Sequence, residues 1–463
     1  MERNGDYRRG FLSYALAAFL VGTVGGFSTV LGPAFVQDIG IPYSNTTWTA
    51  LAQAMSTAAF APVLGKLGDV LGRRVTLLLG VAVFALGNAM TALASTLALM
   101  LIARFIVGVG TAAIAPVVMA YIVSEFPRDR VGAGFAQYML ISSASVIFGP
   151  TLGSLVIASY GWRAMMWLCT AISVAVFLGC LTLSRGEHSE RKQLEHFDGA
   201  GAALVLIFFS LVLCVPSFGQ NFGWSSPAFL AVLAAGLVSL GGLIVTEGRA
   251  ANPILPGGFM GRRAFVLSVL ALFLTQGLMQ ANMTNTIVFV NYTHEENSVV
   301  SGYAISVMYL GMSLGAAFLG PLADRFEPKR VLTGSLLLTA LGCAIQLLFS
   351  ESTAPVLLMA ALGVLGLGLG GNGTIFMKVA LSDLPAEQAG AATGTYGLFR
   401  DLAAPFGVAV FVPMFTNRIT ALTASGLGEA TAAVEAIRGL AWTELVCVAA
   451  GIVVVRLLPR VYR

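Results

Sequence analysis

Long apolar stretches recur along the whole chain, and they constrain its fold more than any other feature. A helix needs about 20 consecutive apolar residues to cross a bilayer core that is about 30 Å thick. The 463 residues supply stretches of that length repeatedly, and 57% of the side chains are hydrophobic while only 10% are charged. The stretches are continuously apolar rather than alternating, which favours spanning helices over a barrel. The sequence therefore predicts an all-α membrane protein with the lipid bilayer as its partner.

Polar breaks divide the chain into fourteen predicted membrane-spanning helices. Most of the 26 Lys and Arg residues fall on the cytoplasmic side if both termini are cytoplasmic, and only Arg163, Arg418 and Arg438 fall outside. Positive charge in cytoplasmic loops fixes orientation, so we expect a multi-pass protein of the cell (plasma) membrane with N- and C-termini cytoplasmic. The predicted spans are residues 11–35, 46–65, 75–94, 97–122, 131–158, 162–183, 199–216, 226–246, 264–290, 300–321, 330–349, 354–380, 388–415 and 437–458.

An internal repeat organises these spans. Gly65–Arg74 recurs as Gly320–Arg330, and the pattern Ser124-Glu-Phe-Pro127 recurs as Ser382-Asp-Leu-Pro385. Two similar halves are the arrangement expected of an alternating-access carrier that binds its substrate between them. We expect three regions: an N-terminal six-helix bundle over 1–183, a charged cytoplasmic linker with two additional helices over 184–263, and a C-terminal six-helix bundle over 264–463.

Cysteine and histidine usage argues against an enzyme or a metalloprotein. The five cysteines lie in apolar runs without CxxC spacing, which is typical of small buried side chains. The three histidines lie in polar connections and form no ligand cluster. We expect no catalytic residues, no metal, no cofactor and no nucleic-acid partner.

The motifs as a set resemble the signature of the major facilitator superfamily. They are the Gly65–Arg74 segment, Arg104 with Gly108, and Gly149-Pro150-x-x-Gly153. Gly161-Trp162-Arg163 and the stretch 253–265 are similar to the fourteen-span drug:proton antiporter branch of that superfamily. The resemblance implies a major facilitator fold of 6 + 2 + 6 helices, a small-molecule substrate, coupling to protons and a monomer.

Charges in the repeated motif predict a conformational latch on the cytoplasmic side. Asp69 can form exposed ion pairs with Arg73 and Arg74, and Asp324 can do the same with Lys329. The alternative is that these charges only set the topology.

Proline next to glycine predicts a helix kink within the membrane. Gly149 and Pro150 form one such site, and Pro405 forms the other in the second half. Plain helix packing is the alternative. In the family this pattern accompanies antiporters, but Ser145 and Ser154 stand where glycines are expected, which weakens the indication of antiport.

Ionisable residues inside the predicted spans are functional candidates, because each costs free energy unless it faces a cavity or a partner. Arg104 and Arg400 predict a cationic site for an anion, since the first span contains no acid that would attract a cation. Asp401 and Glu444 are the candidate proton carriers. For Glu444 an interfacial position is the alternative.

Polar side chains on the ninth span complete the predicted substrate site. Gln276, Gln280 and Thr284 share one helical face, where they can bind substrate hydroxyls or tie helices together. The stretches Thr275–Thr284 and Gly397–Asp401 resemble bacterial bile acid transporters of the superfamily. The leading hypothesis is therefore proton-coupled uptake of an amphipathic organic anion such as a bile acid. The alternative is a proton-driven multidrug efflux antiporter.

Overall fold

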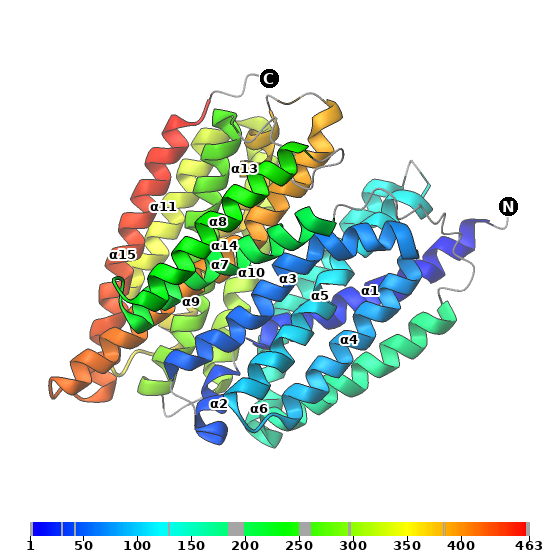
Figure 1. The fold of residues 1–463 in the computed structure, drawn as a ribbon. Coiled ribbons are helices and arrows are strands. Elements are labelled where there is room, and N and C mark those ends of the chain that lie inside the picture. The colour runs from blue at the N-terminus through cyan, green and yellow to red at the C-terminus, as the bar shows by residue number, and fades with distance from the viewer. Residues whose placement is uncertain are drawn as a thin grey trace. The chain divides into compact units, whose positions relative to one another are not determined.

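A computed structural model shows an all-helical chain over the residues that it describes, as the apolar stretches predict (Figure 1). These residues are 3–28, 31–40, 43–127, 130–183, 199–249, 261–294, 298–382, 384 and 386–459. The predicted linker 184–198 and most of the stretch 253–265 lie outside them. The helices are α1 (Arg3–Ser28), α2 (Gly32–Ile39), α3 (Tyr43–Leu71), α4 (Arg73–Leu93), α5 (Leu97–Glu125), α6 (Val131–Leu183), α7 (Gly199–Phe222), α8 (Pro227–Arg249), α9 (Arg263–Thr293), α10 (Ser298–Arg325), α11 (Pro328–Gln346), α12 (Pro355–Gly370), α13 (Asn372–Leu381), α14 (Ala386–Ala424) and α15 (Glu429–Leu457).

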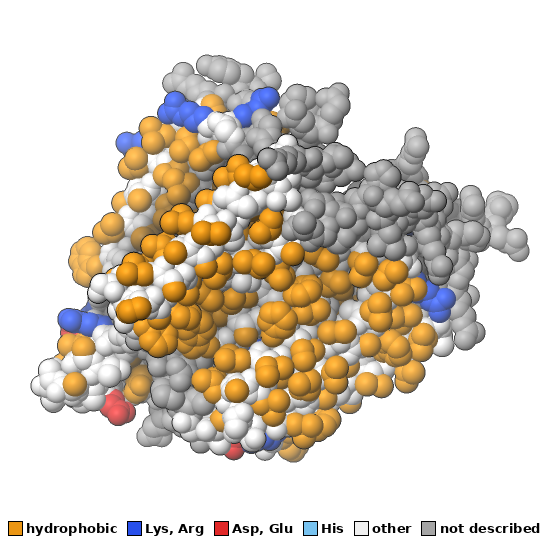
Figure 2. All heavy atoms as spheres, in the orientation of Figure 1, with side chains coloured by type: hydrophobic (Ala, Val, Ile, Leu, Met, Phe, Trp, Pro, Cys, Tyr) orange, Lys and Arg blue, Asp and Glu red, His pale blue; other side chains and the backbone are white. Residues whose placement is uncertain are grey.

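Many of these helices are long and apolar enough to cross a membrane. Ten candidate spans are found among the described residues. One of them, Gln137–Thr182, contains a break at Gly161, whose φ of 81° interrupts α6 where the sequence predicts a boundary between two spans. Figure 2 shows hydrophobic side chains over much of the visible helix surface, with charged side chains near helix ends. The membrane fold is confirmed, while the count of fourteen spans stays a prediction.

The chain divides into two compact units. The first comprises Met1–Ser210 with Ala250–Ile254, and the second comprises Leu211–Arg249 with Leu255–Arg463. In the first unit α1 packs on α6, α3 on α5, and α4 on both α5 and α6. In the second unit α9 packs on α14, α10 on α12, and α11 on both α12 and α15. The sequence repeat is therefore matched by a repeat of helix pairings.

Glycines hold the corresponding helix pairs at close range in both units. A Cβ atom added to Gly149 of α6 would lie 2.6 Å from the Thr23 carbonyl oxygen of α1. A Cβ atom added to Gly407 of α14 would lie 2.2 Å from the Gly277 carbonyl oxygen of α9. Neither backbone can retreat without separating the helices, so packing accounts for the small residue at these positions better than a need for flexibility.

The repeated motif proves more helical than we predicted. We expected Gly65–Arg74 to form a loop, but α3 continues to Leu71 and α4 begins at Arg73. The single residue between them, Gly72, has a φ of 93°, a backbone conformation that side chains disfavour. One glycine is thus enough to reverse the chain, and the rest of the motif extends the two helices.

Three other boundaries differ from the prediction, and a glycine lies at the break in two of them. The first predicted span, 11–35, ends at Ser28 and is followed by the separate α2, which starts at Gly32. The predicted span 354–380 is broken at Gly371 into α12 and α13, because several glycines weaken the helix there. The stretch 416–436 between the last two predicted spans is mostly helix, with the chain turning at Gly426 at a φ of 97°.

Candidate functional site

Of the side chains that the structure describes, only two charged ones are buried, and each unit contains one of them. Arg104 of α5 is 2% exposed, and Glu444 of α15 is 0% exposed. Both were predicted from the sequence as intramembrane charges. The Glu444 side chain lies among α9, α11 and α15, and the interfacial alternative for its depth in the membrane stays open.

Arg104 is held by neutral groups of three other helical segments. Its Nη1 atom donates to Gln53 Oε1 of α3 at 3.1 Å and to Ser28 Oγ at the end of α1 at 3.4 Å. Its guanidinium carbon lies 5.5 Å from the centre of the Phe35 ring of α2, a distance at which a cation and an aromatic face attract each other. No carboxylate among the described residues forms an ion pair with it.

Glu444 is likewise held by neutral groups. Asn282 Nδ2 of α9 donates to Glu444 Oε1 at 2.7 Å, and Gln346 Nε2 of α11 donates to Asn282 Oδ1 at 2.5 Å. The thiol of Cys343, one turn before Gln346 on α11, faces the carboxyl group. A carboxyl group and two amides from three helices thus form one buried network.

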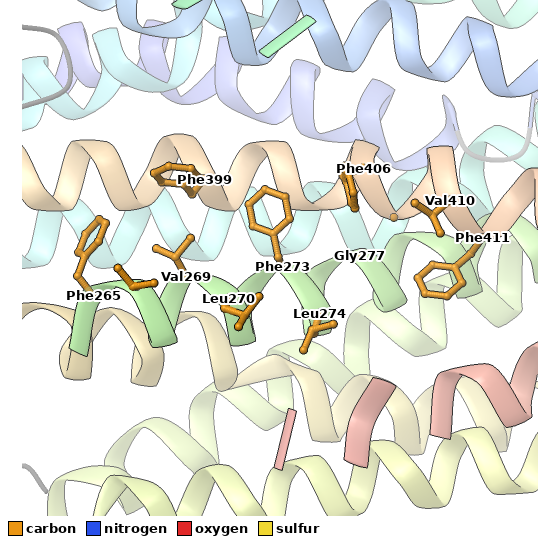
Figure 3. Close-up of a pocket in the computed structure, with 12 residues that line it drawn as sticks. Phe265, Val269, Leu270, Phe273, Leu274, Gly277, Phe399, Phe406, Val410 and Phe411 are labelled. Atoms are coloured by element: carbon orange, nitrogen blue, oxygen red, sulfur yellow. The ribbon is translucent and has the colours of Figure 1, made fainter. Parts of the chain in front are cut away.

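An aromatic pocket lies between α9 and α14 in the second unit (Figure 3). Its volume is about 640 Å³, within the range of roughly 300–1,000 Å³ that is typical of small-molecule sites. The Phe273 ring centre lies 5.7 Å from that of Phe406 and 6.3 Å from that of Phe399. The lining is entirely apolar: Phe265, Val266, Val269, Leu270, Phe273, Leu274, Gly277, Phe399, Phe406, Gly407, Val410 and Phe411.

The sequence misses this pocket because its residues come from two helices more than 120 positions apart. Phenylalanines in a spanning helix are equally typical of a lipid-facing surface. A usable signal is the pair Gly277 and Gly407, which marks where the two backbones meet and hence which phenylalanines can share a space.

The basic residues of the predicted latch bind helix ends within their own units. Arg73 donates to Ser124 Oγ and lies 3.7 Å from Glu125 Oε1 at the end of α5. Arg74 donates to the Leu181 carbonyl oxygen at the end of α6 at 2.9 Å. Lys329 donates to the Arg456 carbonyl oxygen at the end of α15 at 3.3 Å. The side chains of Asp69 and Asp324 lie outside the described residues, so the latch stays a prediction.

Similar contacts between an arginine side chain and a helix end occur at the other ends of the same helices. Arg163 in the second half of α6 donates to the Ala94 carbonyl oxygen at the end of α4 at 3.2 Å. Arg438 of α15 donates to the Phe349 carbonyl oxygen after α11 at 2.7 and 3.1 Å. In the first unit α4 is therefore joined at both ends to the second half of α6. In the second unit α11 is joined at both ends to α15. Cationic groups are favourable at such C-terminal carbonyl groups.

Arg400 and Asp401 lie in the interior of α14. The Arg400 side chain is exposed, and the Asp401 side chain lies outside the described residues, as does that of Pro405. The polar residues predicted to share a face of α9, Gln276, Gln280 and Thr284, are all half-buried. Their roles in binding stay predictions.

Sequence reasoning identified Arg104 and Glu444 but not the groups that hold them. Gln53 and Gln346 are isolated polar residues in apolar helices, and nothing in their local sequence shows which charge each one faces. Asn282 and Asn285 offered a signal, since two buried amides one turn apart on a spanning helix require polar partners.

The sequence matches the model of the Major Facilitator Superfamily over residues 11–292 and 272–460. It is 25% identical over 379 residues to multidrug resistance protein Stp of Mycobacterium tuberculosis, covering 82% of this chain and 70% of that protein. It is 26% identical over 432 residues to puromycin resistance protein pur8 of Streptomyces alboniger, covering 90% and 84%. An uncharacterised MFS-type transporter of M. tuberculosis is 26% identical over 410 residues, which are 88% of this chain, and the chain spans only 59% of its length.

Solved transporters share the fold at low sequence identity. The POT family transporter PepTSo superimposes with a TM-score of 0.69 and 15% identity over 97% of this chain and 98% of its own. The nucleoside transporter NupG superimposes with a TM-score of 0.65 and 14% identity over 98% and 99%. With a family match along nearly the whole sequence and this fold, the chain belongs to the Major Facilitator Superfamily of membrane transporters.

Proposed function

We propose that the protein exports lipophilic, drug-like compounds from the cell by alternating access, driven by a proton gradient. The observation that carries this proposal is the apolar aromatic pocket between α9 and α14. A site without a hydrogen-bonding side chain in its lining selects for apolar area and ring shape rather than for a particular polar pattern. Relatives named for multidrug and puromycin resistance support the same direction and substrate class.

The pocket is suited to fused or stacked rings. Phe273 stands between Phe399 and Phe406 with interplanar angles of 63° and 66°, so ring edges and faces both border the cavity (Figure 3). Val266 and Leu270 at its rim are each 47% exposed, which leaves the pocket accessible from the apolar surface of the helices. A lipophilic compound dissolved in the membrane can therefore enter it without crossing water.

The test uses purified protein in proteoliposomes with an acidic lumen. Antiport predicts that ethidium accumulates in the lumen and that a protonophore abolishes the accumulation. Phe273→Ala should raise KM about tenfold, because losing a buried aromatic contact costs about 1.5 kcal/mol or more. Phe318→Ala on α10 is the matched control, since Phe318 is 69% exposed and outside the pocket. Equal effects of the two substitutions would remove the pocket from the substrate path.

Proton-coupled uptake of an amphipathic organic anion such as a bile acid is the second candidate. The specific observation in its favour is Arg104, a buried cation that is held by the neutral side chains of Ser28, Gln53 and Phe35. This mode requires the opposite gradient: a labelled bile acid should accumulate when the outside is acidic. A ligand of the native state also raises its apparent stability, so thermal stabilisation across a panel of bile acids and lipophilic cations distinguishes the two substrates.

A further inference from the structure

The second unit contains a buried polar cluster that is separate from the aromatic pocket. Glu444, Asn282 and Gln346 come from three different helices, and each is 1% exposed or less. None of them lines the pocket. Placing three polar side chains in the core of a bundle of apolar helices is costly unless they have a function or satisfy one another fully.

The hydrogen bonds in this cluster run in one direction. Gln346 donates to Asn282, and Asn282 donates both to Glu444 Oε1 and to the Leu278 carbonyl oxygen. The side-chain amides of Asn282 and Gln346 are therefore both oriented with an N–H group towards the carboxyl group. Oε1 is satisfied by this arrangement, and Oε2 is left to another partner.

Four buried polar atoms of the cluster have no hydrogen-bonding partner. They are Glu444 Oε2, Gln346 Oε1 and both terminal atoms of the Asn285 side chain. Asn285 lies one turn beyond Asn282 on α9 and is 0% exposed. Unsatisfied buried groups cost about 1–3 kcal/mol each and are rare in native proteins. Glu444 Oε2 and Gln346 Oε1 belong to one hydrogen-bonded network, so their lack of partners indicates that the site binds a further donor or ion.

Among the described residues, none provides a counter-ion to Glu444. The titratable groups that face it are the thiols of Cys343 on α11 and Cys447 on α15. None of the described ion pairs on α9, α11, α14 or α15 includes Glu444. An ionised carboxylate without a cation is unfavourable in such a place, so the chemistry of the cluster calls for a positive charge.

We propose that Glu444 binds the coupling proton on its Oε2 atom, within the network that it forms with Asn282 and Gln346. The proton adds to the carboxylate to give a neutral carboxylic acid, and the same reaction in reverse releases it. The new O–H group is a donor, and Gln346 Oε1 and Asn285 Oδ1 are acceptors that lack one. Binding of one proton thus neutralises the carboxylate and gives a hydrogen-bonding partner to two of the four unsatisfied atoms.

This inference extends the proposed function, because it rests on transport being driven by a gradient. It assigns the driving ion to a site in the second unit that differs from the substrate pocket, and it selects Glu444 rather than Asp401. It also predicts that substrate binding and coupling can be separated by substitution.

The decisive variant is Glu444→Gln, which is close in size and permanently neutral. In proteoliposomes it should retain substrate counterflow within about twofold of the wild type, while gradient-driven accumulation falls at least about tenfold. Glu435→Gln is the matched control: Glu435 is on the same helix, its side chain is 51% exposed, and it should leave both activities unchanged. Gradient-driven accumulation that survives in Glu444→Gln would overturn the assignment.

The outcomes distinguish the two proposals. A wild-type protein without gradient-driven transport would refute the exporter, whereas an active wild type with an equally active Glu444→Gln would refute only the proton site. Transport that needs Glu444 but follows a sodium gradient at constant pH would show that the cluster binds a sodium ion, and the proton assignment would be wrong.

A second measurement needs no variant. Hydrophobic carbodiimides react with protonated carboxyl groups in apolar surroundings, and peptide mass spectrometry locates the adduct. Wild-type protein should be labelled at Glu444, more at low pH than at high pH, and bound substrate should change the extent of labelling. Labelling elsewhere on the chain with Glu444 unmodified across the pH range would contradict the proposal.

Discussion

Arg104 and Glu444 occupy similar surroundings in the two units but carry opposite charges. Each is buried, each is held by a side-chain amide from a neighbouring helix, and neither has an ion-pair partner among the described residues. The scaffolds around them also correspond, with close glycine contacts and terminal contacts in equivalent helix pairs. The two charges are carried by different helices of the repeat, however: Arg104 is on α5, whose counterpart is α12, and Glu444 is on α15, whose counterpart is the second half of α6.

The two charges differ in what they can do during transport. A guanidinium group keeps its charge throughout the physiological pH range, whereas a carboxyl group changes charge by binding one proton. The first unit thus supplies a constant positive charge, and the second supplies a carboxyl group whose charge changes when it binds or releases a proton. Two copies of one scaffold can divide these tasks without any change of architecture.

The strongest test of this comparison is Arg104→Met. Transport should fall about a hundredfold, while thermal stability stays equal or rises, since apolar replacements of buried charges are often neutral or stabilising. Arg104→Lys restores the charge but not the planar geometry and should recover part of the activity. Fluorescence-monitored melting and proteoliposome transport measure the two effects. A large loss of stability in Arg104→Met would make its role structural.

The likeness of the scaffolds is tested by alanine at the close glycine contacts. Gly407→Ala and Gly149→Ala should each reduce the free energy of unfolding by about 1–3 kcal/mol, because the added methyl group meets backbone atoms. Gly397→Ala and Gly179→Ala are matched helical controls with open space around the added Cβ atom. Melting of the purified variants provides the comparison. If only one unit is sensitive, the correspondence between the units is wrong.

The terminal contacts should have smaller effects. Arg438→Met removes two hydrogen bonds to the Phe349 carbonyl oxygen from a side chain that is 39% exposed. A loss of about 1 kcal/mol is expected. Arg163→Met removes one hydrogen bond to the Ala94 carbonyl oxygen and an exposed ion pair with Asp38 that contributes little, so it should cost less in the same melting assay. The reverse order would mean that these contacts do not determine the stability of the last helix.

The smallest effect is expected at Asp38 of α2. Its carboxylate pairs with Arg163 and accepts from Trp162 Nε1 at 2.9 Å, and both ion-pair partners are about 40% exposed. Asp38→Asn keeps an acceptor for Trp162 and should cost about 0.2–1 kcal/mol. The difference from wild type should shrink in high salt, because screening weakens exposed pairs. A loss that is independent of salt would indicate that Trp162 packing, rather than charge, is disturbed.

Much of the fold could be predicted from the sequence because lipid imposes a simple rule on apolar stretches. The helical class, the repeat and the family resemblance to the major facilitator superfamily are confirmed. The breaks at Gly72 and Gly371 were harder to predict, since a helix boundary depends on how a glycine is packed as well as on its presence. Glycines such as Gly277 remain within a helix because a neighbouring backbone fills the space.

The candidate site was predictable only in part. Buried charges such as Arg104 and Glu444 are visible in a sequence because they are rare in apolar helices. Their partners and the aromatic pocket depend on which helices are neighbours, and this information is distributed over the whole chain. The substrate preference shows the consequence: the charges favoured an anion, whereas the pocket and the drug-resistance relatives favour lipophilic compounds.

The contacts at both ends of α4 and α11 also fix the distance that these two helices span. α4 has 21 residues and α11 has 19, and a rise of 1.5 Å per residue makes each about 30 Å long. Basic side chains fixed at both ends leave these helices little freedom to tilt or slide when the bilayer becomes thicker or thinner. Transport should therefore depend on the acyl-chain length of the surrounding lipids, with an optimum where the hydrocarbon thickness equals that span.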